Sequence, residues 1–129
     1  MNKEIIKTEN APKALGPYCQ GCIYNGMIFV SGQIPLDPKT NQIVEGDITV
    51  QAKRSLDNIK AILNEAGSSM DDLLKITVFL KDMNDFSTFN NLYGEYFTSG
   101  HEPTRTVVEV ARLPKDALIK IDAIGIKHD

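Results

Sequence analysis

The chain has 129 residues, of which 42% are hydrophobic and 24% charged, with a formal net charge of −3, so one globular domain spanning residues 1–129 is predicted. The acidic balance makes nucleic acid an unlikely main partner, because binding to a phosphate backbone is driven by clustered Lys and Arg. No apolar run approaches the roughly 18 residues that span a bilayer and no secretory signal opens the chain, so we expect a cytoplasmic protein without membrane contact.

The N-terminal part of the chain predicts three strands. Residues 3–7 are expected to form a short first strand. Residues 20–24 and 27–33 flank Asn25-Gly26, a dipeptide favoured in two-residue type I′ turns, and therefore predict a hairpin. Residues 36–46 are rich in turn-forming residues and predict a loop.

A long amphipathic helix is predicted next, over residues 48–66. Its apolar side chains recur every three or four positions, as one helical face requires. Asp47 can cap the start of this helix, and Gly67 can end it in the left-handed conformation. The apolar stripe comprises Ile48, Ala52, Leu56, Ile59, Leu63 and Ala66.

The second half of the chain predicts a strand over residues 73–81, a helix that opens at Asp85, and two further strands over residues 106–111 and 118–126. The second helix carries an aromatic stripe, which is more typical of a packed core than of a cofactor site. The stripe comprises Phe86, Phe89, Tyr93, Tyr96 and Phe97.

These elements predict an α+β fold, with a mixed sheet of about six strands and two helices on one face. Residues 27–30 (Met-Ile-Phe-Val) are apolar at consecutive positions, as expected of a strand covered on both faces. Two helices can cover only one face. A neighbouring copy of the chain is therefore expected to cover the other.

Cys19 and Cys22 have the spacing of a redox or zinc motif, but the chain has no second cysteine pair. Strand positions three apart face opposite sides, so their sulfurs should point away from each other. His101 and His128 accompany no cluster at metal-ligand spacing. We therefore expect neither a metal nor an organic cofactor.

Arg105 stands just after a proline at the mouth of a β-branched strand, where a rigid backbone could aim its planar fork of donors at a small carboxylate. An ordinary exposed arginine is the alternative. Gly32 either lets a ligand approach the backbone or lets the strand leave the sheet. Tyr18 either lines a site or packs in the core, and Asn90 alone suggests a solvated helix residue.

Three motifs, in this order, carry a family resemblance: Gly16-Pro17-Tyr18, the run Ser-Gly-Gln-Ile-Pro at 31–35, and the run from Pro103 to Asp116. From about Thr8 to Ile126 the chain resembles the reactive-intermediate imine deaminase A (RidA) family, also called the YjgF or L-PSP translation-inhibitor family. The resemblance implies a chorismate-mutase-like fold and a homotrimer around a central barrel, with a site in each intersubunit cleft.

The resemblance also implies an activity: hydrolytic deamination of 2-enamine and 2-imine acids, such as 2-aminoacrylate and 2-iminopropionate, to 2-keto acids and ammonia. It implies that Arg105 anchors the substrate carboxylate and that Tyr18, Ser31, Gly32 and Asn90 line the cleft. Val107 stands where the family usually has a cysteine, a tolerable loss because hydrolysis uses water as the nucleophile.

Lys120 stands where the family usually has a glutamate that positions or activates the attacking water, a role that an ammonium group without an acceptor cannot fill. Lys120 itself could be the base if the like charge of Arg105 nearby favours its deprotonated form. Alternatively, binding and polarising the substrate could be enough for catalysis, with the attacking water supplied by solvent. Two further alternatives are a trimer that binds small carboxylates without turnover, and an endoribonuclease or translation inhibitor. The acidic composition and the absence of a His-Lys or His-His cluster disfavour the ribonuclease.

Overall fold

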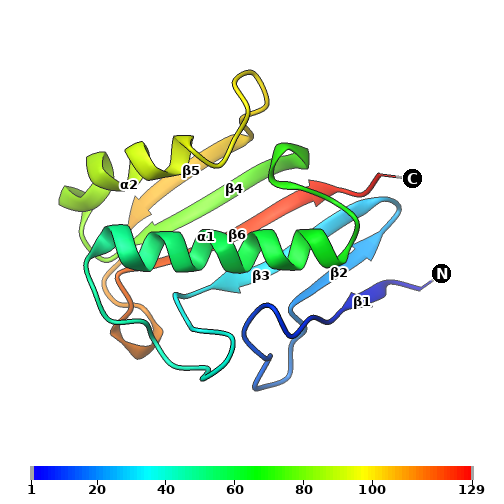
Figure 1. Cartoon of the computed structure of the whole chain (residues 1–129), viewed down its shortest axis with the longest axis horizontal. Helices are drawn as coiled ribbons and strands as arrows, with labels where there is room; N and C mark the ends of the chain where they lie inside the picture. Colours follow the sequence, from blue (N-terminus) through cyan, green and yellow to red (C-terminus); the bar gives the residue numbers. More distant parts are fainter. Residues whose placement is uncertain (1, 129) are drawn as a thin grey trace.

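A six-stranded sheet with two α-helices against one face forms the molecule in the computed structural model, which describes residues 2–128 (Figure 1). The strand order is β1-β2-β3-β6-β4-β5. Only β4 and β5 are parallel, so the sheet is mixed, as predicted. The strands are β1 (Glu4–Ile6), β2 (Gly21–Tyr24), β3 (Met27–Gln33), β4 (Leu73–Leu80), β5 (Thr104–Glu109) and β6 (Ile119–Ile126).

The predicted hairpin joins β2 and β3. Asn25 has a φ of 51° and Gly26 a φ of 76°, the left-handed pair that a type I′ turn requires. The register pairs Tyr24 with Met27 directly across this turn. The hairpin is therefore confirmed, and the turn fixes which side chains of β3 face the helices.

Helix α1 (Ile48–Glu65) is the long amphipathic helix that the sequence predicts. The carboxylate of Asp47 accepts a hydrogen bond from the amide of Val50 at 3.2 Å, which confirms the N-cap. The chain leaves the helix through Gly67, whose φ is 77°. All six members of the predicted apolar stripe are buried.

Helix α2 (Phe86–Gly94) begins after a single 3₁₀ turn, η2 (Met83–Asp85), and ends before the last two members of the aromatic stripe. Gly94 is a poor helix former, so the helix stops there. The rings of Tyr93 and Phe97 nevertheless lie 4.8 Å apart, and both are buried in the core. The aromatic stripe is thus core, as predicted, although Tyr96 and Phe97 belong to the turn after the helix.

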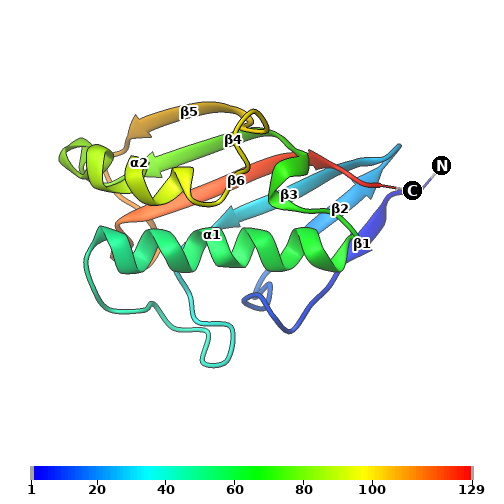
Figure 2. The ribbon, with the colours of Figure 1, turned by 45° about the horizontal axis from the view of Figure 1, so that its top comes forward.

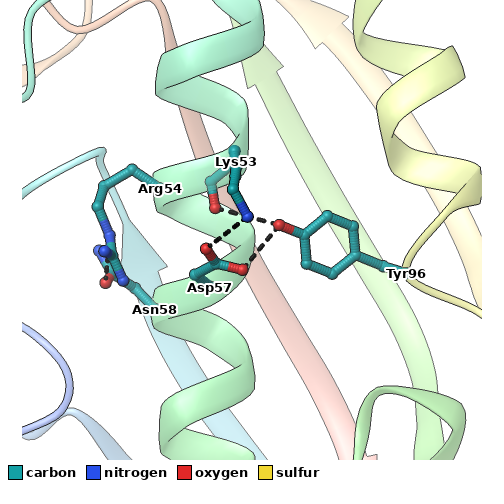
Figure 3. Close-up of polar contacts among 5 residues, drawn as sticks. All are labelled: Lys53, Arg54, Asp57, Asn58 and Tyr96. Carbon is teal, nitrogen blue, oxygen red and sulfur yellow. Dashed lines mark hydrogen bonds and ion pairs between the residues drawn. The ribbon is translucent and has the colours of Figure 1, made fainter.

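Polar contacts fasten this turn to α1 (Figure 3). The hydroxyl of Tyr96 donates a hydrogen bond to Asp57 at 2.7 Å, and Lys53 pairs with the other carboxylate oxygen at 3.3 Å. Burial, together with the hydrogen bond to Asp57, raises the pKa of Tyr96 above its ordinary value, so the hydroxyl remains a donor at neutral pH. The contacts hold the end of α2 beside α1.

Only one face of the sheet is covered, since both helices lie on the same side of it (Figure 2). In β3, Ile28 and Val30 are buried, whereas Met27 and Phe29 are 38% and 41% exposed. This uncovered side of the sheet is called the open face below. A single chain thus leaves half of the apolar run in β3 without cover, as the sequence predicts.

The bounds of the edge strand differ from those predicted. β5 begins at Thr104, two residues before the predicted start at residue 106, and ends at Glu109. Parallel pairing with β4 starts where Lys75 lies opposite Thr104, and the Thr104 hydroxyl donates to the carbonyl of Leu74 at 2.8 Å. Arg105 is therefore the second residue of the strand.

Candidate functional site

Arg105 is held by three side chains of α2. Its guanidinium carbon lies 4.8 Å from the ring centroid of Tyr93 and 5.4 Å from that of Phe86. Its Nη1 donates a hydrogen bond of 2.7 Å to Oδ1 of Asn90. Stacking on ring faces and one hydrogen bond fix the plane of the cation, while its other N–H groups form no hydrogen bond with the described residues. An exposed, oriented fork of this kind suits a carboxylate.

The ring of Tyr93 offers Arg105 a neutral face. Burial raises the pKa of Tyr93 to about 12, the nearby charge of Arg105 opposes this shift and that of Glu102 adds to it. The phenol is therefore protonated at neutral pH, and within residues 2–128 its buried hydroxyl has no hydrogen-bond partner. Tyr93 supports the guanidinium by stacking alone.

Four other predicted site residues line a separate pocket of about 460 Å³ where β3 ends and β6 begins. Tyr18, Ser31, Gly32 and Lys120 all contribute to its wall. This volume lies within the range of small-molecule sites, roughly 300 to 1,000 Å³. We call it the lysine pocket, because Lys13 and Lys115 line it as well.

Lys120 crosses directly over Gly32. A Cβ atom placed on Gly32 would clash with Cε of Lys120 and touch its Cγ and Cδ, so a larger residue at position 32 would require the flexible end of the lysine to shift. One of the two sequence interpretations is that Gly32 admits a ligand to the backbone. In this structure the aliphatic part of Lys120 occupies that space.

Arg105 and Lys120 project from opposite faces of the sheet. Arg105 pairs with Ile76, whose side chain is buried on the helix side, whereas Lys120 pairs with Phe79 on the open face. Within one chain the sheet therefore separates Lys120 from Arg105. Among the described residues Lys120 forms no ion pair with Asp122 either.

Two remaining sequence predictions concern Val107 and the cysteines. Val107 is half-buried and packs against the core on the same face as Arg105. Cys19 and Cys22 are both free thiols. No group of three or more potential metal ligands occurs between residues 2 and 128. In that same stretch, neither helix has the length and apolar character needed to cross a membrane.

Sequence reasoning missed the two rings around Arg105 and two of the three lysines. Phe86 and Tyr93 were assigned only to the core, although spacings of four and three residues place them on one helical face with Asn90. That spacing was the available signal. Lys13 lies more than 100 residues before Lys120, and Lys115 lies five residues before it in a different element, so no local pattern connects the three.

The fold and these two clusters define a class: single-domain α+β proteins with a small-ligand pocket and an oriented surface arginine. A family model described as Endoribonuclease L-PSP matches residues 8–127. Together with the relatives below, this match shows that the chain belongs to the L-PSP family, which includes the RutC, YjgF and Rid proteins.

Curated relatives match over almost their whole length. A RutC family protein of Pyrococcus abyssi is 56% identical, covering 99% of this chain and 100% of the relative. A protein of Salmonella typhimurium named 2-iminobutanoate/2-iminopropanoate deaminase is 52% identical, covering 97% of this chain and 98% of the relative.

Solved structures match equally well. The structure of E. coli TdcF with bound serine is 47% identical, with a TM-score of 0.90, and covers 97% of this chain and 99% of that one. The E. coli YjgF gene product is 50% identical, also with a TM-score of 0.90 and the same coverage. The predicted family is therefore confirmed.

Proposed function

We propose that this chain hydrolyses 2-imino acids, and the 2-enamine acids that tautomerise to them, to 2-keto acids and ammonia. The observation that carries the proposal is the guanidinium of Arg105, fixed by two rings and Asn90 with donors left for a carboxylate. The relatives named 2-iminobutanoate/2-iminopropanoate deaminase, at 52% identity, support this choice of substrate. The cytoplasm is the proposed compartment.

The chemistry required of the protein is modest. Water adds to the electrophilic imine carbon, the C–N bond then breaks, and nitrogen leaves as ammonia with the protons that water supplied. Arg105 binds the carboxylate beside this carbon and thereby orients it, a contribution of the kind that proximity provides. Val107 supplies no nucleophile, and none is needed because water is the attacking group.

We propose further that the site is completed between copies of the chain. Arg105 and the lysine pocket lie on opposite faces of one sheet, so a small substrate that uses both must take them from two chains. The open face, with Met27 and Phe29 exposed, offers the apolar surface for such an association. A homotrimer with its sheets around a central barrel satisfies both requirements.

The assembly has a direct test. Sedimentation or light scattering on dilute protein is expected to give a mass near three times the 14.3 kDa of one chain. Phe29→Lys places a charge on the open face and is expected to lower this mass. Val50→Lys, an equally exposed apolar position on α1, is the matched control. A stable wild-type monomer would refute both the proposed assembly and the proposed shared site.

The activity has its own test. Freshly generated 2-iminopropionate, coupled to detection of pyruvate, is expected to lose its imine faster with the protein than in buffer. A parallel incubation of metal-free protein with RNA addresses the ribonuclease description of the family. RNA cleavage without imine hydrolysis would refute the proposal.

A second function, binding of small carboxylates without turnover, is favoured by Lys120. An ammonium group in the place of a water-activating carboxylate gives no acceptor for a proton. A relative, E. coli TdcF, has been solved with bound serine. Binding of pyruvate with no acceleration in the coupled assay would establish this second function instead of the first.

A further inference from the structure

We propose that the lysine pocket selects imino acids that carry a second acidic group, so that the favoured substrates are 2-imino dicarboxylates. This inference rests on the proposed function and names the substrate class of the same site. In it, Arg105 of a neighbouring copy binds the carboxylate next to the imine. The lysine pocket binds the carboxylate at the far end of the substrate.

All the charged side chains that line the pocket are cationic. Lys13, Lys115 and Lys120 contribute to its wall, and no Asp or Glu occurs among the described residues that line it. Within residues 2–128, none of the three ammonium groups forms an ion pair or a hydrogen bond with another side chain. Three unpaired positive charges around one cavity create a potential that attracts an anion.

Three neutral polar side chains of the pocket already donate hydrogen bonds to backbone carbonyls. The hydroxyl of Ser31 donates to the carbonyl of Cys19 at 2.6 Å, and the amide of Gln33 donates to the carbonyl of Ser31 at 3.1 Å. The amide of Gln20 donates to the carbonyl of Pro12 at 2.8 Å. Besides the hydroxyl of Tyr18 and the amide of Asn41, the lysines are therefore the side-chain donors available to a ligand, and they prefer a charged acceptor.

Three separate backbone segments carry these lysines, and each segment is fixed. The stem of Lys120 lies against Gly32. Lys115 sits in the 3₁₀ turn η3 (Pro114–Asp116) with a φ of 56°, a left-handed conformation that is unusual for a lysine. The amide of Lys13 donates to Oδ1 of Asn41 at 3.1 Å. Three backbone segments of defined conformation thus bring the lysines to the wall of one pocket.

A substrate with one carboxylate makes no use of the three lysines. Its single carboxylate is taken by Arg105, so a methyl or ethyl group would face the three ammonium groups and gain nothing from them. A second carboxylate gains charge-assisted hydrogen bonds and relieves repulsion between like charges. Discrimination between the two ligand classes therefore comes from Lys13, Lys115 and Lys120.

The test compares stable product analogues by calorimetric titration at constant ionic strength, with 2-oxoglutarate as the dicarboxylate and 2-oxobutanoate as the monocarboxylate. Wild-type protein is expected to bind 2-oxoglutarate about tenfold more tightly, as one additional charge-assisted hydrogen bond provides. Lys13→Met and Lys120→Met keep the aliphatic stems and are each expected to remove most of this preference. Lys60→Met, on an exposed position of α1, is the control and should retain it.

Equal affinity for both ligands, or a preference that survives in Lys13→Met and Lys120→Met alike, would overturn the inference. Equally tight binding of inorganic phosphate would also overturn it, since this would indicate a general anion site. The coupled assay separates this inference from the proposed function. Turnover of 2-iminopropionate without the dicarboxylate preference rejects only the substrate class, whereas a lysine-dependent preference without any imine turnover rejects only the hydrolysis.

Discussion

Replacing Lys120 with glutamate is expected to raise the rate of 2-iminopropionate hydrolysis by about 10²- to 10⁴-fold, the range that a positioned general base contributes. Wild-type protein should turn this substrate over weakly, because an ammonium group cannot accept a proton from the attacking water. A glutamate side chain is unbranched and shorter than lysine, so it also fits over Gly32. Affinity for pyruvate should change little, since Arg105 is untouched.

The measurement is the initial rate of pyruvate formation in the coupled assay. Lys120→Met removes the ammonium group without adding an acceptor, so this control should show no comparable gain. Robust wild-type turnover that Lys120→Glu abolishes would contradict the prediction and make the lysine part of the mechanism. Equal rates in all three proteins would mean that residue 120 does not act on the water.

Arg105→Lys is expected to weaken binding of pyruvate or 2-oxobutanoate by about 1 to 3 kcal/mol, the range for charge-assisted hydrogen bonds. A lysine keeps the charge but loses the planar fork and the stacking on Phe86 and Tyr93. It would also lose the directed hydrogen bond to Asn90. Titration of each ligand into wild-type and variant protein measures the effect.

Arg54→Lys is the matched control. Arg54 is a partly buried arginine on α1 that donates a hydrogen bond of 3.1 Å to Asn58, so it shares the chemistry of Arg105 but not its place in the proposed site. Its variant should bind 2-oxobutanoate as wild-type protein does. Unchanged affinity in Arg105→Lys would refute the anchoring role.

Local sequence signals were sufficient for the elements that depend on few distant contacts. Asn25-Gly26 specified the hairpin because both residues tolerate a positive φ. Asp47 and the apolar stripe specified α1 because capping and periodicity act within a few turns. The open face also followed from the sequence. β3 is apolar at consecutive positions and therefore on both of its faces, but the two helices can cover only one face of the sheet.

The bounds of β5 and α2 could not be predicted in this way. β5 lies at the edge of the sheet, and its start at Thr104 is set by pairing with β4, a segment about thirty residues earlier in the chain. Local propensity contains no information on that register. The aromatic stripe after Asp85 suggested a longer helix, but Gly94 ended it and packing alone kept Phe97 in the core.

The candidate site was predicted in part. The hydrogen bond between Arg105 and Asn90 brings together two residues that the family resemblance had placed in one cleft. The stacking on Tyr93 was not predicted, because a buried aromatic residue on a helix is core far more often than support for a cation. The opposite orientation of Arg105 and Lys120 required the sheet register, which only the structure provides.

The contact between Gly32 and Lys120 links two positions that lie in different strands. A side chain at position 32 would clash with Cε of Lys120, so alanine there would make the lysine side chain take another path. The same alanine beside a short residue at position 120 would meet nothing comparable. The effects of substitutions at the two positions are therefore non-additive, and which residues are permitted at one position depends on the residue at the other.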